Sequence, residues 1–215
     1  MEFRIRCRLL LLFLIATLVN AMTMNNKNTK TLRLPNGVGV NTLLLRPYSY
    51  STDWEPLDAM CYELFGGWDY LPAKAETYAS DPDCDFMVLQ DYSTGSLVAT
   101  GNLRTMDPPY ASSFWLEAIR VSPQFQGRGV CTLLVKELCQ RAQQRGANEI
   151  LSCAIDTNEA MKTVFGKPGI NMVPVAGFDH PEWADESEQE PPQNIVYRWK
   201  AAEKTTTKTK TGRND

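Results

Sequence analysis

The chain has 215 residues, which is enough for one well-packed domain and little material for two. Its composition, 43% hydrophobic and 22% charged, is that of an ordinary globular protein. A net charge of -3 argues against nucleic acid as a partner, because phosphate backbones select strongly basic surfaces.

The first 21 residues are typical of a secretory signal peptide. A basic stretch with three arginines precedes an apolar run over residues 9–19, and Ala21 offers a small residue at a cleavage point. The run is too short to span a bilayer comfortably as a permanent helix. We therefore expect no stable membrane association once this leader is removed.

The leader predicts entry into the secretory pathway or an organelle. The alternatives are a short signal anchor, or translation from Met22 or Met24, which would leave the protein cytoplasmic. Residues 22–34 contain no acidic residue and are rich in Asn, Thr and Lys. In an organism with a complex plastid they could form a transit segment behind the signal. We assign residues 22–40 as a linker.

One domain is expected over residues 41–200, with its elements identified by hydrophobic periodicity and turn residues. Strands are predicted at residues 41–49, 113–121, 149–155 and 194–200, with a hairpin over 85–104. Helices are predicted at residues 51–65, 73–80, 129–145 and 157–166.

The order of these elements predicts the fold class. Antiparallel strands come first, and a strand–helix–strand unit follows that requires a parallel pair. We therefore expect an α/β (α+β) fold, with a mixed central β-sheet and helices on both faces. The acidic stretch at 182–192 is expected to be a solvated loop, and residues 201–215 a disordered tail.

A loop with two glycines lies between the strand at 113–121 and the helix that follows. It comprises Gln126, Gly127, Arg128, Gly129, Val130 and Cys131. Glycines let backbone N–H groups point at one spot, and the helix dipole adds partial positive charge, so the loop suits a phosphate. A P-loop would need a lysine followed by a hydroxyl residue, and a dinucleotide fingerprint would need a third glycine where Thr132 stands. From the loop alone, a tight connection without a ligand is equally expected.

The stretch "VSPQFQGRGVCTLL" resembles the acetyl-CoA loop of the Gcn5-related N-acetyltransferase (GNAT) superfamily. That pattern is Gln/Arg-x-x-Gly-x-Gly/Ala after a strand that ends in Val-x-Pro, and here Cys131 replaces the final Gly or Ala. The resemblance implies that backbone amides of residues 126–131 bind the pyrophosphate of coenzyme A. It also implies that the main chain at Ile119 and Val121 hydrogen-bonds the pantetheine arm. The fold expected from the resemblance is the GNAT fold.

A second block, "DTNEAMKTVFGKPGI", resembles the family's asparagine-containing helix and the Gly-Phe pair that follows it. The match implies that Asn158 contacts the cofactor arm. Phe165 occupies the position where many members have a tyrosine that protonates the leaving thiolate. Phenylalanine cannot donate that proton, so either water or another group serves, or catalysis is impaired.

Within the superfamily, "GGWDYLPAKAETYASDP", "FWLEAIRV" and "QGRGV" resemble the histidine N-acetyltransferase-like branch of animals. Members of that branch are longer and have an additional C-terminal region. If that region shapes the acceptor pocket, the identity of the acceptor cannot be carried over.

Glu117 is the candidate general base. Strict alternation places it on one face with Trp115, Ile119 and Val121. A carboxylate on an apolar face destabilises the fold unless it has a partner or a functional role. Desolvation would raise its pKa toward the range that a general base for an ammonium substrate needs. The alternatives are an exposed edge position or a structural ion pair, for instance with Arg104.

Asp69 and Tyr70 are candidate acceptor-binding residues, because the resemblance places their segment at the wall of the acceptor site. The alternative is a turn in which Asp69 caps the next helix. Arg120 is expected on the face opposite Glu117, in a structural ion pair. His180 is the chain's one histidine and is expected in a loop. We expect no metal site, since no cluster has convincing ligand spacing.

The sequence thus predicts an acetyl-CoA-dependent N-acetyltransferase whose acceptor is a primary amine of a small molecule or amino acid. Acetyl-CoA is the co-substrate, and a homodimer is compatible with the chain. The alternatives are a peptide or protein N-acetyltransferase, a non-catalytic acyl-CoA-binding module and a secreted interaction domain.

Overall fold

The computed structural model describes residues 29–34, 42–107, 110, 112–176 and 194–201. The predicted leader, residues 202–215 of the predicted tail, and the predicted loop regions with His180 and the acidic stretch at 182–192 lie outside these ranges. Within them, no helix combines the length and the apolar character that crossing a bilayer would require.

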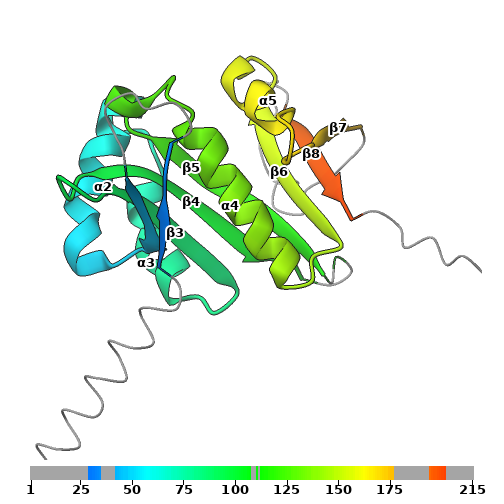
Figure 1. Ribbon diagram of the computed structural model, residues 1–215, viewed down its shortest axis with the longest axis horizontal. Coiled ribbons are helices and arrows are strands. Elements are labelled where there is room, and N and C mark those ends of the chain that lie inside the picture. Colours follow the sequence, from blue (N-terminus) through cyan, green and yellow to red (C-terminus); the bar gives the residue numbers. More distant parts are fainter. Residues whose placement is uncertain (1–28, 35–41, 108–109, 111, 177–193, 202–215) are drawn as a thin grey trace, which may run out of the picture.

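Eight strands of the described residues form one mixed sheet, in the order β1-β2-β3-β4-β5-β6-β8-β7 (Figure 1). The parallel pair is β5 with β6, and the other neighbours are antiparallel, which confirms the predicted mixed sheet. The strands are β1 Lys30–Leu32, β2 Leu43–Pro47, β3 Cys84–Asp91, β4 Leu97–Thr105, β5 Ser113–Val121, β6 Glu149–Ile155, β7 Val173–Val175 and β8 Asn194–Lys200.

Helices cover both faces of the sheet, as the sequence predicts. In Figure 1, α4 crosses the near face, and α2 and α3 lie behind the sheet. Separate buried clusters lie beneath α4 and beneath α2 and α3. The helices are α2 Tyr50–Phe65, α3 Leu71–Ser80, α4 Val130–Gln144 and α5 Glu159–Phe165, with a short 3-10 turn at Pro123–Phe125.

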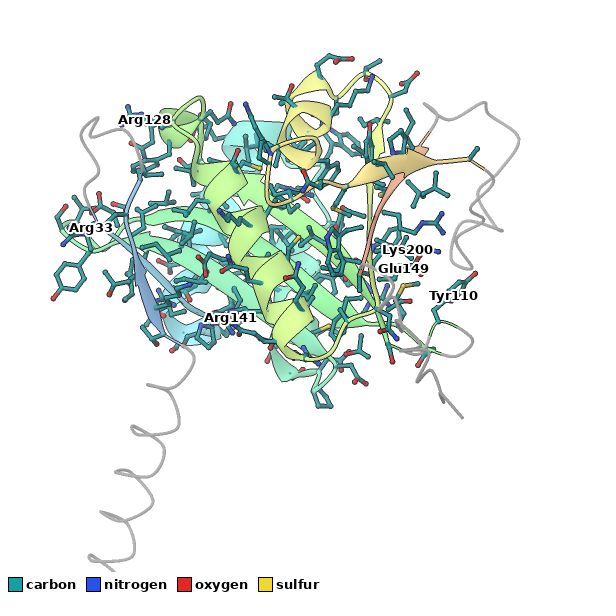
Figure 2. All side chains as sticks on the ribbon, turned by 45° about the vertical axis from the view of Figure 1, so that its right-hand side comes forward. Arg33, Tyr110, Arg128, Arg141, Glu149 and Lys200 are labelled. Atoms are coloured by element: carbon teal, nitrogen blue, oxygen red, sulfur yellow. The ribbon has the colours of Figure 1, made fainter. Side chains whose placement is uncertain are left out.

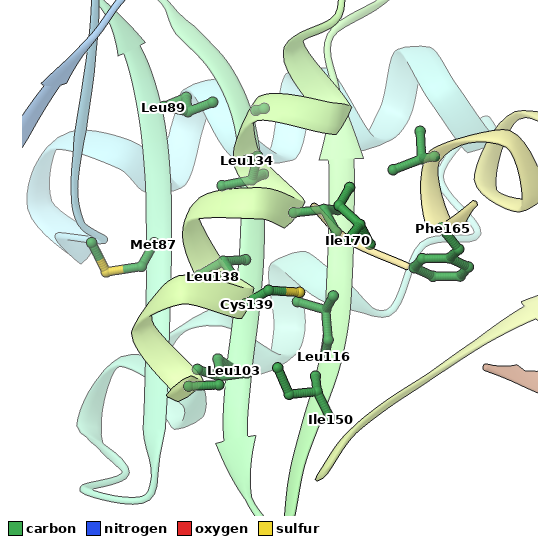
Figure 3. Close-up of a cluster of buried hydrophobic side chains, with 14 of the residues drawn as sticks. Met87, Leu89, Leu103, Leu116, Leu134, Leu138, Cys139, Ile150, Phe165 and Ile170 are labelled. Carbon is green, nitrogen blue, oxygen red and sulfur yellow. The ribbon is translucent and has the colours of Figure 1, made fainter. Parts of the chain in front are cut away.

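The apolar stripe of α4 explains its position. Val130, Leu134 and Leu138 recur every four residues and are at most 1% exposed. They pack on sheet residues that include Leu103 and Leu116 (Figure 3). Burying each of these leucines contributes about 1.5–3 kcal/mol, so the stripe fixes the helix against β4 and β5.

Strand β1 is not expected from the sequence. It lies within residues 22–40, where a linker was expected, and it pairs antiparallel with β2. Leu32 is 6% exposed and joins the cluster beneath α4. Three residues are too few for a periodic pattern, so tertiary pairing and not local sequence defines this strand.

A β-bulge at Ala118 overturns the predicted alternation along β5. The register across β4 and β5 shifts by one residue after Glu117, and Ala118 has a φ of 55°. Beyond the bulge, Ile119 and Val121 pack against the cluster beneath α4. They therefore do not share a face with Trp115 and Glu117, and Arg120 lies on the α2–α3 side, with Glu117.

Strands β5 and β6 pair only along their first halves. The parallel ladder joins Ser113–Leu116 to Glu149–Ser152, although both strands continue. At its end, the Ser152 hydroxyl donates to the Leu116 carbonyl at 2.7 Å, and the Thr100 hydroxyl donates to the Ala118 carbonyl at 3.1 Å. These bonds satisfy buried carbonyls at the end of the ladder and at the bulge. The candidate site lies along the half of β5 that β6 does not pair.

Candidate active site

A cleft of about 580 Å³ lies along the distal half of β5, beside the start of α4 and α5. Most of the residues predicted to contact the cofactor line it. These are Ile119, Val121, Gln126, Gly127, Gly129, Val130, Cys131 and Asn158. The structure thus brings together two sequence blocks that are about thirty residues apart.

The glycine loop at the start of α4 has a backbone that other residues adopt only with strain. Gly127 and Gly129 have φ values of 70° and 80°, and a Cβ atom at either position would meet nothing within 4 Å. Conformation, and not crowding by the protein, therefore requires glycine here. No side chain caps the first turn of α4 at Gly129, so the amides there are suited to an anion in the cleft.

Two further contacts order the walls of the cleft. The Gln126 side chain donates to the Val121 carbonyl at 3.1 Å and ties the loop to the end of β5. The Asn158 side-chain oxygen accepts from the Met161 N–H at 3.1 Å and caps α5. Asn158 thus has a structural role as well as a place on the wall.

Arg128 and Phe165 are not among the residues that line the cleft. Arg128 is exposed at the outer edge of the loop, with its guanidinium 5.7 Å from the Phe125 ring centroid (Figure 2). Phe165 is 0% exposed and packs 4.8 Å from the Tyr197 ring, in the same cluster as Ile170 (Figure 3). A ring without a polar atom gains most from full burial, and the structure gives Phe165 a core position.

Glu117 lies on the α2–α3 side of β5, at the last paired position before the bulge. Its Oε1 atom accepts from Asn102 Nδ2 at 3.0 Å and lies 3.4 Å from Arg104 Nε. The side chain is 15% exposed. The ion pair with Arg104, the structural alternative from the sequence, is therefore present, and the role of general base stays a prediction.

The surroundings of Glu117 come from several elements. Burial, with a contribution from the Glu117 charge, raises the pKa of Cys84 and of Cys153 to about 11. The same two causes raise the pKa values of Tyr70 and Tyr78. These four groups remain neutral at pH 7 and add no charge to the environment of Glu117.

Asp69 and Arg120 form a buried ion pair that joins the turn before α3 to β5. Arg120 Nε and Nη2 donate to the two Asp69 oxygens at 2.7 and 2.8 Å, and the Leu71 N–H donates to Oδ1 at 3.0 Å. Burial alone would raise the pKa of Asp69, but these donors outweigh it and the pKa is lowered. The contacts favour the turn alternative for Asp69.

Tyr70 is half-exposed, and its ring centroid lies 5.5 Å from the Arg120 guanidinium. The Phe65 ring lies on the same guanidinium at 4.9 Å. Arg120 itself lines the cleft together with Leu64. The Asp69–Arg120 pair therefore connects the segment that carries Tyr70 to the cleft wall.

Sequence reasoning missed several residues of this region. It expected an ion pair for Arg120 but named no partner, because the partners are 51 residues apart, and it placed Arg120 on the wrong face, because the bulge is not visible in the sequence. It also passed over Asn102, although a polar amide inside an apolar strand was a usable signal. Among the described residues, no three potential metal-binding side chains come together.

Comparison with known proteins finds similar sequences and a matching family. A family model described as the acetyltransferase (GNAT) family matches residues 48–167, more than half of the chain. A histidine N-acetyltransferase from Oreochromis niloticus is 23% identical over 109 residues, which are 51% of this chain and 31% of that protein. A histidine N-acetyltransferase from Scomber australasicus is 24% identical over 93 residues, 43% of this chain and 26% of that protein.

The match therefore spans less than a third of the length of these curated relatives. Among solved structures, the GNAT domain of S. lividans PAT has a TM-score of 0.59 and 17% identity, with 80% of this chain and 97% of that domain covered. This likeness shows the fold. Because the family model covers more than half of the sequence and the solved domain has the same fold, the chain belongs to the acetyltransferase (GNAT) family, a family of acyltransferases.

Proposed function

We propose that this chain is an acetyl-CoA-dependent N-acetyltransferase that acts on a primary amine of a small molecule or amino acid. The observation that carries this proposal is the cleft along β5, because it combines a glycine loop suited to an anion with the backbone of the strand. The Glu117 carboxylate does not line this cleft and precedes Ile119 of its wall by two residues on β5.

The residues of the cleft fit coenzyme A. The open space at Gly127 and Gly129 would admit the pyrophosphate, which the amides of residues 126–131 would hold. The main chain at Ile119 and Val121 would align the pantetheine arm, and Asn158 also lines the cleft. When bound, acetyl-CoA supplies an acetyl group activated as a thioester.

The protein's own part in the reaction is to position the reactants and to move a proton. A backbone N–H near Val121 would polarise the thioester carbonyl. Glu117, directly or through water, would take a proton from the acceptor ammonium so that the free amine can attack. Holding both reactants in one cleft supplies much of the rate through positioning.

The preference for an amino acid or small amine is supported by the curated relatives, which are named histidine N-acetyltransferases. A peptide or protein amine is the runner-up. Since the match covers less than a third of those relatives, the acceptor has to be determined by experiment.

The experiment combines calorimetry with coenzyme A and a thiol-release assay with acetyl-CoA. The acceptor panel contains free amino acids including histidine, simple amines, and peptides with a free N-terminus or a lysine. We expect coenzyme A binding, and thiol release that is faster with a small amine than with any peptide. Faster release with peptides would select the runner-up.

A non-catalytic acyl-CoA-binding module is the second candidate. Phe165 favours it, because this position lacks the hydroxyl that protonates the thiolate in many members of the family. Coenzyme A binding without turnover on any amine would select this candidate and overturn the enzyme proposal.

A further inference from the structure

Asn102 is a buried polar side chain that the proposed reaction does not yet use. It is 0% exposed on β4 and lies opposite Glu117 in the strand register. Its Nδ2 atom donates to Glu117 Oε1 at 3.0 Å, and Cys84 Sγ, a weak acceptor, lies 3.4 Å away. The strongest contact of this amide is therefore with the candidate base.

Packing does not explain an asparagine at this position. Asparagine is depleted in strands, and a buried amide is stabilising only when both its donors and its oxygen are paired. The Asn102 Oδ1 atom has no hydrogen-bond partner among the described residues. Such a group destabilises the fold, and exceptions of this kind in native proteins often mark functional positions.

Arg104 on β4 is a charged neighbour of Glu117 among the described residues. The other described titratable groups that the Glu117 charge influences are Tyr70 and Tyr78, before and on α3, and Cys84 and Cys153, on β3 and β6. Arg104 Nε approaches Oε1 at 3.4 Å, which is longer than the 3.0 Å bond from Asn102. The amide therefore fixes the orientation of the carboxylate more closely than the guanidinium does.

We propose that Asn102 is a positioning residue that orients the Glu117 carboxylate and favours its ionised form in the reaction. This inference rests on the proposed function, in which Glu117 takes the proton from the acceptor. A hydrogen bond donated to a carboxylate stabilises the charged form, so its removal makes the carboxylate easier to protonate. Loss of the Asn102 donor thus weakens the base at low pH and leaves the cofactor loop untouched.

Two variants and a matched control test the proposal. Asn102→Leu removes the donor together with the unpaired oxygen, and Asn102→Asp keeps the shape but faces Glu117 with a second carboxylate. Ser113→Ala is the control, because it removes a buried donor to another carboxylate, Glu149, at the far end of β5. Circular dichroism and thermal unfolding verify that each variant is folded.

The first readout is the pH profile of kcat/KM for the acceptor amine. We expect the acidic limb to move up by about one pH unit in Asn102→Leu and further in Asn102→Asp, so that kcat/KM of Asn102→Leu falls about tenfold at pH values below the midpoint of the limb. The KM for acetyl-CoA stays within about twofold of the wild type, since the loop at 126–131 is unchanged. A purely structural role predicts the wild-type profile in Asn102→Leu and in the control, whereas Asn102→Asp moves the profile by repulsion between two carboxylates whatever the role of the amide.

The second readout does not depend on turnover. Carbon-13 NMR of labelled glutamate follows the titration of the Glu117 carboxyl, and Glu117→Gln assigns its signal. We expect the midpoint to rise in the order wild type, Asn102→Leu, Asn102→Asp. An unchanged midpoint overturns the inference. If the Glu117 midpoint shifts in the Asn102 variants but Glu117→Gln is fully active, the assignment of Glu117 as the base is overturned instead. The two failures are therefore distinguishable.

Discussion

The ion pair between Asp69 and Arg120 gives the sharpest stability prediction. Asp69→Asn removes the negative charge opposite Arg120 but keeps the oxygen that accepts from the Leu71 N–H. The Asp69 side chain is 2% exposed and that of Arg120 15%. The substitution therefore leaves a guanidinium largely buried without its counter-charge.

The expected loss of unfolding free energy follows from this burial. Breaking a buried pair by removal of one partner destabilises a protein by about 3–5 kcal/mol. Arg120 retains its bond to the Ile119 carbonyl at 3.0 Å and the rings of Phe65 and Tyr70, and water reaches part of it. We therefore expect the lower end of the range, about 3 kcal/mol.

The assay is urea unfolding followed by circular dichroism at pH 7. Asp85→Asn is the matched control, because Asp85 pairs with Arg145 at 2.9 Å while both side chains are about one-third exposed. An exposed pair is worth at most about 1 kcal/mol. If Asp69→Asn were no more destabilising than Asp85→Asn, the burial argument would be refuted.

The pH dependence of the same pair has a defined sign. The pKa of Asp69 in the folded state lies below its ordinary value of 3.8. The pair's contribution is therefore complete above that value and is lost as pH falls through the lower folded pKa. The difference in unfolding free energy between wild type and Asp69→Asn should be constant from neutral pH to about pH 5 and shrink below about pH 4. A difference that grew on acidification would contradict the assignment.

The remaining predictions concern the bulge, the loop, the base and the leader. Thr100→Val leaves the buried Ala118 carbonyl unpaired and should lower the unfolding free energy by about 1–3 kcal/mol in urea titrations. Gly129→Ala forces a side chain onto a φ of 80° and should weaken coenzyme A binding about tenfold by calorimetry. Gly95→Ala, with a φ of 75° in the β3–β4 turn, strains the backbone equally and should bind normally. Glu117→Gln should retain coenzyme A binding and lose turnover, and normal turnover across pH would exclude it as the base. A reporter fused behind residues 1–40 should enter the secretory pathway or an organelle, and a cytosolic signal would contradict the predicted leader.

The elements of the fold were predictable because local patterns specify them. The four-residue stripe of α4 recurs over a whole helix, and the β-rich runs of β3 and β4 flank a turn at residues 93–95. Strand β1 was not predictable, because three residues carry no period and its pairing with β2 is tertiary.

The parts of the candidate site that a short sequence motif specifies were predictable. The parts that depend on packing between distant residues were not. The loop at 126–131 and Asn158 meet at one cleft, as the resemblance implies. The bulge at Ala118 places an alanine in a strained conformation and reverses the face of every later residue of β5, which alternation cannot reveal. The contact of Asn102 with Glu117 depends on strand register, which is fixed by the whole sheet.

Transfer of a labelled acetyl group is the most direct test of the proposed N-acetyltransferase activity. The purified full chain is incubated with acetyl-CoA labelled in the acetyl carbons and with the amine panel, and the products are analysed by mass spectrometry. We expect the label on the amine nitrogen of a small acceptor, in proportion to the coenzyme A released, and we expect no labelled amine with Glu117→Gln. Binding of coenzyme A with no labelled amine from any acceptor would contradict the proposed activity.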